Sequence, residues 1–463
     1  MKKMHVVRII LISLLLVAFM VNLNTGIGIQ SSIDNKYLQE FPDVGEGYEA
    51  FLSNLNTYLT ERIGGRSSLL EANLILNDKL FQIMQHPIYE YGKDGYVFFR
   101  VGKSQEDYEF LDFFTDYLKR IQDYCQARGV PFIYLLNPSK ATVYKEYLPD
   151  GYTDENNRLK VLQQHLKDKG INHVDNSPYL SRLAETQQVF NRKYDAGHWN
   201  ALGAFWGVNN LLTEMQKYDP SIRPNDLKDF SISSEMKYNL PVSNFPIEES
   251  VPVITEIIPS YTPFETGMQY EVLRDPNYPD FFRFESNAKN NTNLLIFHGS
   301  YFHGFGHPFL ARAVKIYQGI HNYQNILNFD YYFNIFQPNF VVVTSAEYAT
   351  TEDYFNMSLL REKQLNPPLD KKELEELDET EELVSLVGVE HEVYITKIIF
   401  HVSTDIELGY FVSGDYIFDL IQDGENWSVS LRNDHLTFEN ARVYLLTKSG
   451  EKLMLPIINN DPV

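Results

Sequence analysis

The stretch Leu294-Leu-Ile-Phe-His-Gly-Ser300-Tyr301 is an apolar run that ends in a Gly-Ser turn, a pattern typical of a buried strand. Helix-favouring residues follow at 308–317, and a second apolar run, Phe340-Val-Val-Val-Thr344, comes after them. Buried strands that alternate with helices indicate a parallel, doubly wound sheet covered by helices. We therefore expect an α/β fold with Ser300 at the carboxyl end of a strand, where open α/β sheets place their sites.

The same alternation extends toward the N-terminus. Helices are predicted at 106–128, 157–169 and 202–217, and strands at 131–136 and 171–174. Residues 219–285 interrupt the pattern with Pro-rich and β-like pieces, and we interpret them as an insertion in the α/β domain. The domain as a whole is expected to span 31–365.

The C-terminal part of the chain has a different pattern. A charged connector is expected over 366–383, and short apolar runs separated by turn signals such as Asp423-Gly424 follow it. Short strands at this spacing predict a small β-sandwich-like module over 384–463.

The first thirty residues decide where the protein is expected. Lys2, Lys3 and Arg8 accompany an apolar run over 6–23, which is just long enough to span a thin bilayer. The exit from this run matches a small-residue cleavage site poorly, so a retained signal anchor over 1–30 is favoured over a cleaved signal peptide. Basic residues stay on the inner side of a membrane, and we expect the bulk of the chain outside a bacterial cell, held by a single pass.

Composition excludes several classes of function. The chain has 463 residues, and its 62 acidic residues outnumber 40 basic residues to give a net charge of −22. This balance argues against nucleic-acid binding, which needs clustered Lys and Arg. The single cysteine, Cys125, excludes a disulfide framework and Cys-rich zinc motifs.

Asp195, His198 and Ser300 can fill the three roles that serine acyl transfer requires. A serine hydroxyl is a weak nucleophile and needs a base, which His198 can supply. Asp195, three residues earlier, can orient the imidazole and stabilise its protonated form. The alternative is that Asp195 or Asn200 caps a helix and the histidine only packs, because an Asp-x-x-His pair also arises by chance.

A metal site at His303 and His307 is not expected. The two residues would share a face if they were helical, as zinc ligands do, but Gly304, Gly306 and Pro308 break such a helix. We therefore expect neither a metal ion nor another cofactor.

Five phrases of the chain together resemble one known family. In chain order they are Gly92-Lys-Asp-Gly-Tyr-Val-Phe98; Pro138-Ser-Lys140 with Tyr144 and Leu148-Pro149; Asp195-Ala-Gly-His-Trp199 with Asn200, Gly203 and Ala204; Phe297-His-Gly-Ser-Tyr301; and Pro338-Asn-Phe-Val-Val-Val343 with Glu347. They are similar to phrases of the AlgX/AlgJ-like group, which comprises alginate O-acetyltransferases and their Gram-positive relatives, the DHHW proteins. That group places its Asp-His pair before its serine, whereas ordinary SGNH hydrolases place the serine first. The resemblance covers residues 45–350 and implies an SGNH-hydrolase-like fold.

The resemblance also implies roles for single residues. Ser300 would carry the acyl group, His198 would act as the base and Asp195 would orient it. The backbone N–H of Ser300 or Tyr301 would help to hold the oxyanion. Contacts to the oxyanion or the substrate are further implied for Lys140, Tyr144 and His298.

The implied reaction is a two-step transfer of an acetyl group through a serine acyl-enzyme. The acceptor would be a surface or secreted polysaccharide, and the donor partner would be a membrane-bound O-acyltransferase. Two alternatives stay open: a polysaccharide O-acyl esterase, and a non-catalytic polysaccharide-binding or assembly protein of exopolysaccharide export. The pair His298-Gly299 keeps the second one open, because the family carries Gly-Asp or Gly-Thr before its serine.

Overall fold

The computed structural model describes residues 2–20, 31, 37–43, 45, 47–86, 88–100, 108–152, 157–241, 245–264, 267–272, 281–369, 384–402, 405–437 and 441–456. Residues 21–30 of the expected anchor and 370–383 of the expected connector lie outside this set. The apolar run at the start of the chain lies largely in helix α1 (Lys2–Met20). Among the described residues, no helix combines the length and the apolar character that crossing a membrane requires.

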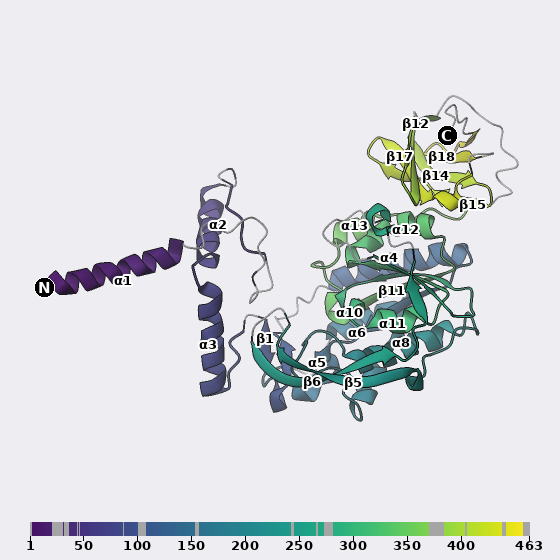
Figure 1. Ribbon diagram of the computed structural model, residues 1–463. Helices are drawn as coiled ribbons and strands as arrows, with labels where there is room; N and C mark the ends of the chain where they lie inside the picture. Colours follow the sequence, from purple (N-terminus) through teal and green to yellow (C-terminus); the bar gives the residue numbers. More distant parts are fainter. Residues whose placement is uncertain are drawn as a thin grey trace.

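Within the described residues, a seven-stranded sheet forms the centre of the α/β region, in the order β4-β3-β11-β9-β10-β8-β7 (Figure 1). Its parallel part consists of β3 (Phe132–Asn137), β4 (His173–Asp175), β9 (Asn293–His298), β10 (Ile316–His321) and β11 (Phe340–Ala346). The predicted parallel sheet is confirmed. An antiparallel edge, β8 (Phe281–Ser286) with β7 (Tyr261–Pro263), extends it beyond the prediction.

Helices cover both faces of this sheet. Figure 1 shows α4 (Tyr108–Ala127), α12 (Phe329–Phe336) and α13 (Met357–Glu362) on one side of β11, and α8 (Ala201–Met215) with α11 (Gly306–Ala311) on the other. Buried residues recur along α4 at helical spacing, so that helix turns one apolar face inward. Every residue of β3 and β11 is buried, which explains why these strands are continuous apolar runs.

The remaining elements of the N-terminal and α/β regions are short or peripheral. Their bounds are α2 (Tyr48–Glu61), α3 (Arg66–Phe81), α5 (Lys140–Val143), α6 (Asn157–Asp168), α7 (Ser177–Ala184), α9 (Gln269–Val272), α10 (Ser300–His303), β1 (Tyr89–Tyr91) and β2 (Val97–Phe99). The helix predicted over 308–317 is wrong at its C-terminal end, because α11 stops at Ala311 and β10 begins at Ile316. One apolar stretch here contains both a helix and a strand, which periodicity alone does not separate.

The insertion predicted over 219–285 contains an antiparallel ribbon. Strand β5 (Phe230–Asn239) pairs with β6 (Pro246–Glu256), and Lys237 lies opposite Glu249 in their register. Helix α8 contacts β6. The same insertion also supplies β7, so part of it belongs to the central sheet.

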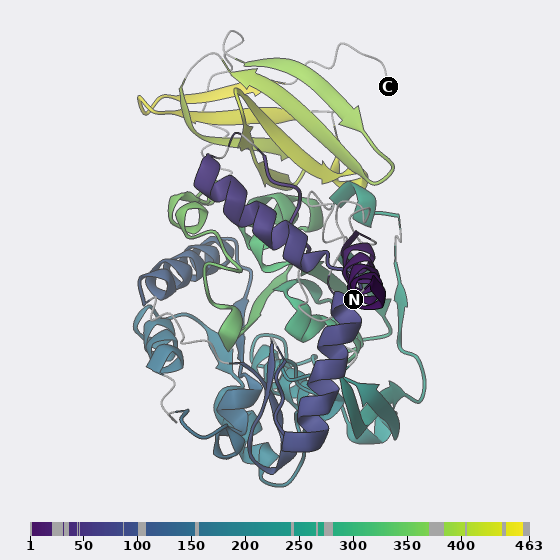
Figure 2. The ribbon, with the colours of Figure 1, turned by 90° about the vertical axis from the view of Figure 1, so that its left-hand side faces the viewer.

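The C-terminal region is β-rich, as the sequence predicts. One sheet has the order β12-β13-β17-β16 and the other β15-β14-β18-β19, and side chains from both form one buried apolar cluster. Figure 2 shows these sheets stacked at one end of the α/β region. The strands are β12 (Val384–His391), β13 (Ile395–Val402), β14 (Ile406–Ser413), β15 (Tyr416–Asp419), β16 (Ile421–Asp423), β17 (Asn426–Arg432), β18 (Arg442–Thr447) and β19 (Lys452–Pro456).

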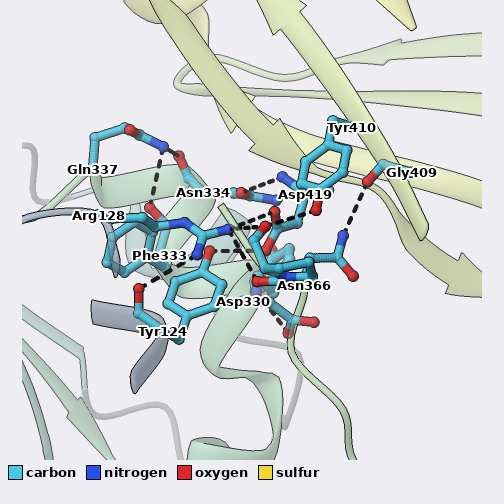
Figure 3. Close-up of polar contacts among 12 residues, drawn as sticks. Tyr124, Arg128, Asp330, Phe333, Asn334, Gln337, Asn366, Gly409, Tyr410 and Asp419 are labelled. Carbon is cyan, nitrogen blue, oxygen red and sulfur yellow. Dashed lines mark hydrogen bonds and ion pairs between the residues drawn. The ribbon is translucent and has the colours of Figure 1, made fainter. Parts of the chain in front are cut away.

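A buried polar network joins the C-terminal region to the α/β region (Figure 3). The Asn334 side chain donates to the carbonyl oxygen of Asp419 over 2.8 Å and accepts from its backbone N–H over 3.0 Å. The Asp419 carboxylate accepts from the Tyr124 hydroxyl over 2.8 Å and from Arg128 over 3.2 Å. These contacts fix β15 against α4 and α12.

Candidate active site

Ser300 lies at the end of a buried strand, as the sequence predicts. Strand β9 ends at His298, Gly299 is extended, and Ser300 is the exposed first residue of the short helix α10. A Cβ atom on Gly299 would lie 2.1 Å from the Tyr323 ring, so only glycine allows this close approach. The strand and the glycine together bring the hydroxyl to the carboxyl edge of the sheet.

Asp195 and His198 lie in the loop that leads into α8. Asp195 has a φ of +55°, a left-handed conformation that Asp tolerates better than most residues. Its Oδ1 atom accepts from the backbone N–H of His198 over 3.1 Å and from that of Gly197 over 3.3 Å. Asn200 caps α8 by accepting a hydrogen bond from the Gly203 N–H, so the alternative prediction of a helix cap is correct for Asn200. Asp195 is directed to the histidine instead.

The three predicted triad side chains come together. His198 Nδ1 lies 2.8 Å from Asp195 Oδ1, and His198 Nε2 lies 3.3 Å from Ser300 Oγ. Burial would lower the pKa of His198, but the hydrogen bond and the charge of Asp195 outweigh that effect and raise the pKa. A more basic imidazole beside an exposed serine is the arrangement that general-base catalysis needs.

Tyr348 lies near Ser300 and is not among the site residues that the sequence predicts. Burial raises the pKa of Tyr348 well above the usual range, and the Ser300 side chain opposes that rise. Tyr348 follows β11, which pairs with β9, so both residues emerge at the same edge of the sheet. The adjacent Glu347 is buried and accepts hydrogen bonds from Ser139 and Thr142, which ties the start of α5 to the end of β11.

Lys140 and Tyr144 do not occupy the substrate-contacting positions implied for them. Lys140 is 1% exposed, and its Nζ atom donates to the carbonyl oxygens of Val97 and Arg192 over 2.8 and 3.0 Å. Tyr144 is 3% exposed, and its hydroxyl accepts from the Val189 N–H. The implied roles are corrected, because both polar groups are buried and engaged with the backbone.

Tyr301 and His298 are also buried. The Tyr301 hydroxyl donates to the carbonyl oxygen of Pro138 over 2.7 Å, which leaves only its backbone N–H for the implied oxyanion role. His298 is fully buried, and its ring packs against those of His303, His307 and His321. The substrate contact implied for His298 is corrected for this reason.

The rings of these four histidines pack together. The centroids of adjacent rings are 4.6 to 6.2 Å apart. Burial, and then the charges of the neighbouring histidines, lower the pKa of His298 and lower that of His307 to about 3. In the part of the chain that the structure describes, no group of three or more His, Cys, Asp or Glu side chains is arranged to hold a metal ion. Burial therefore disfavours the charged form of His298 and His307, the two buried members of this cluster.

Comparison with sequence families confirms the resemblance. Residues 90–235 match the model of a family described as “SGNH hydrolase-like domain, acetyltransferase AlgX”. The fold is therefore SGNH-hydrolase-like, and the matched segment is acetyltransferase-like. The match includes Asp195 and His198 and ends before Ser300. No curated protein matches the chain.

Several solved structures are similar at low identity. Bacillus cereus PatB1 with a sulfonyl adduct is 14% identical, with 59% of this chain and 99% of that chain covered and a TM-score of 0.45. The O-acetyltransferase domain of Pseudomonas putida AlgJ is 16% identical, with coverages of 62% and 98% and a TM-score of 0.40. A DHHW family protein from Eubacterium siraeum is 14% identical, with coverages of 59% and 94% and a TM-score of 0.41.

Proposed function

We propose that this chain is an exported O-acetyltransferase that moves an acetyl group through an acyl-enzyme on Ser300 to a polysaccharide hydroxyl. The observation that carries the proposal is the approach of His198 Nε2 to within 3.3 Å of Ser300 Oγ, with Asp195 on the other imidazole nitrogen. The family match supports acetyl as the transferred group. The exposure of Ser300 gives both a donor and an acceptor access to the hydroxyl.

In the first half-reaction His198 Nε2 accepts the Ser300 proton as Oγ attacks the carbonyl carbon of the acetyl donor. Asp195 stabilises the imidazolium that forms. The developing oxyanion lies near the first backbone N–H groups of α10, because the first N–H groups of a helix make no hydrogen bonds within the helix. The bond from carbon to the donor oxygen then breaks, His198 returns the proton to that oxygen, and the acetyl group stays on Ser300.

In the second half-reaction the acceptor hydroxyl gives its proton to His198 and attacks the acetyl carbonyl. The bond to Ser300 Oγ breaks, and His198 returns the proton to the serine. Water in place of the acceptor would give hydrolysis, so transfer depends on the acceptor displacing water at the exposed site. The same residues therefore serve either reaction, and the acceptor decides between them.

We further propose that residues 1–30 anchor the protein in a bacterial cell membrane with its bulk outside the cell, because basic residues precede an apolar run. A membrane-bound O-acyltransferase would deliver the acetyl group to that side. Proteinase treatment of intact cells tests this location, and we expect the C-terminal region to be digested while a cytoplasmic control survives. A protected chain would contradict the location.

The activity is tested by acetate release from p-nitrophenyl acetate by the full chain. We expect Ser300→Ala to lose about 10³-fold or more, since the serine carries the covalent step. The matched control is Ser358→Ala, which removes an exposed hydroxyl on α13 and should leave the rate unchanged. Equal rates for wild type and Ser300→Ala would contradict the proposal and favour a binding protein.

The effect of an added glycan acceptor distinguishes an acetyltransferase from an esterase. Soluble glycan oligomers are added to the wild-type reaction, and acetylated oligomers are detected by mass spectrometry. Transfer to an oligomer supports the acetyltransferase. Release of acetate with no transfer across a panel of oligomers would favour the esterase.

A further inference from the structure

A residue far away in the sequence holds the segment that leads into Asp195. The carboxylate of Glu249, on β6, accepts hydrogen bonds from three consecutive backbone N–H groups. They are those of Arg192 (to Oε1, 2.6 Å), Lys193 (to Oε2, 2.8 Å) and Tyr194 (to Oε2). Both carboxylate oxygens are used, and hydrogen bonds to an ionised acceptor are stronger than those between neutral groups.

The same segment is held from its carbonyl side. The carbonyl oxygen of Arg192 accepts from the Val97 N–H over 2.9 Å and from Lys140 Nζ over 3.0 Å. The backbone at Arg192 is therefore fixed by the Glu249 carboxylate on one side and by β2 and a buried amine on the other. The residues just before the triad acid have little freedom to move.

This support bears directly on the conformation of Asp195. A φ of +55° is costly for a residue with a Cβ atom, and such conformations persist where the surroundings enforce them. In this turn the Asp195 carboxylate meets both the backbone N–H and the Nδ1 atom of His198. Relaxation to a negative φ would carry the carboxylate away from the imidazole.

The ribbon contributes a second side chain at the same place. Lys237 lies directly across from Glu249 in the register of β5 and β6, and its Nζ atom is 5.3 Å from the centre of the Tyr194 ring. The ribbon therefore contacts the segment through neighbouring side chains on both of its strands. These contacts give a role to an insertion that the triad chemistry leaves unexplained.

We propose that Glu249 is a positioning residue for acyl transfer, which through the backbone amides of 192–194 holds Asp195 where it orients His198. The proposal rests on the function proposed for Ser300. Glu249 does not touch the reacting atoms; it acts through the loop. The β5–β6 ribbon then supports the loop that carries Asp195.

The test compares Glu249→Gln and Glu249→Asp in the full chain. The Gln variant loses the charge and one acceptor oxygen, whereas the Asp variant keeps a carboxylate on a shorter side chain. Glu248→Gln, at the exposed neighbouring position on β6, is the matched control. Each variant is assayed for kcat, KM and the pH profile of p-nitrophenyl acetate cleavage, with thermal unfolding as a check on folding.

We expect Glu249→Gln to lower kcat by about 10- to 100-fold, because small displacements of catalytic groups are costly, with KM changed by less than about threefold. The acid limb of kcat/KM should move to lower pH, since a displaced Asp195 no longer raises the pKa of His198. Glu249→Asp should recover part of kcat. Glu248→Gln should match wild type.

The outcomes separate this proposal from the proposed function. If Ser300→Ala is inactive and Glu249→Gln behaves like Glu248→Gln, the positioning role is overturned and the enzyme stands. If Ser300→Ala is as active as wild type, the proposed function fails first. Loss of the folded state in both Glu249 variants would also overturn the proposal, because a brace for one loop should leave the fold intact.

Discussion

The Nε2 atom of His198 lies 3.3 Å from Ser300 Oγ, although the two residues are 102 positions apart in the chain. The contact forms because β9 ends at the sheet edge beside the loop that enters α8. It joins a histidine inside the segment that matches the acetyltransferase family to a serine outside that segment.

If His198 and Ser300 act as one unit, their losses will not add. We expect His198→Gln to lower acetate release by about 10³-fold or more, and the double variant with Ser300→Ala to be no slower than the slower single variant. His401→Gln, at an exposed position on β13, is the control and should match wild type. Losses that multiply in the double variant would show that the two residues act independently.

The charge of Asp195 should be visible in the pH profile. Asn also tolerates the left-handed φ at position 195, so Asp195→Asn keeps the turn and removes the negative charge. We expect kcat to fall by up to about 10⁴-fold and the acid limb of kcat/KM to move to lower pH, because the raised pKa of His198 depends on Asp195. An unchanged acid limb would contradict the assigned partner.

The same pair also has a stability signature. Because the folded pKa of His198 is raised, its pairing stabilises the fold fully below the unfolded pKa, near 6.5. That stability is lost as pH rises through the folded pKa. The destabilisation by Asp195→Asn, measured by urea unfolding, should be larger at pH 5 than at pH 9.

The sequence predicted the sheet and the approach of Asp195, His198 and Ser300 because each depends on a local signal. Continuous apolar runs specify β9 and β11, and the Gly-Ser turn after β9 places Ser300 at the sheet edge. The Asp-x-x-His spacing allows a contact within one turn, and the structure has that contact. Local patterns of this kind are readable without knowledge of distant neighbours.

The contacts of Lys140, His298 and Glu249 could not be predicted in the same way. Lys140 follows a strand end, as a substrate-binding residue would, but β2 and the loop at Arg192 cover it. His298 precedes the serine, yet its side chain enters a cluster built from three other elements. Glu249 reaches residues more than 50 positions away, and no local pattern marks such a contact.

Burial of Lys140 should make stability rise with pH in the alkaline range. Burial is the main cause that lowers the pKa of Lys140 to about 7 from 10.5. Between these values the unfolded chain holds a proton that the folded chain lacks, so raising the pH from 7 to 10.5 stabilises the fold. Lys140→Met should remove a slope of up to about 1.4 kcal/mol per pH unit in urea unfolding. Lys289→Met, at an exposed position, should keep that slope.

The buried histidines should make the fold sensitive to acid. Burial, followed by the charges of His303 and His321, lowers the pKa of His307 to about 3 from 6.5. As the pH falls from 6.5 to about 3, His307 binds a proton in the unfolded chain but not in the folded chain, so the free energy of unfolding falls. His307→Phe should reduce the change of the free energy of unfolding with pH by up to about 1.4 kcal/mol per pH unit. The exposed control His401→Gln should leave this slope unchanged. An equal slope in wild type and His307→Phe would show that His307 titrates normally.

The ion pair of Arg128 with Asp419 should hold the two regions together more firmly at neutral pH than in mild acid. Arg128 is 17% exposed and Asp419 4% exposed at their side chains, and burial raises the pKa of Asp419 to about 6 even beside the arginine (Figure 3). Removing one partner of a buried pair leaves an uncompensated charge, so Arg128→Met should cost about 3 kcal/mol at pH 8.

The cost of Arg128→Met should shrink at pH 5, where Asp419 can take a proton and no longer needs the arginine. Urea unfolding at the two pH values measures this, with exposed Arg182→Met on α7 as the control. Adding Asp419→Asn to Arg128→Met should recover part of the loss at pH 8, because the second change removes the charge that the first leaves unpaired. A loss that is equal at both pH values and is not recovered would mean that Arg128 stabilises the junction by packing on Tyr124 rather than by its charge.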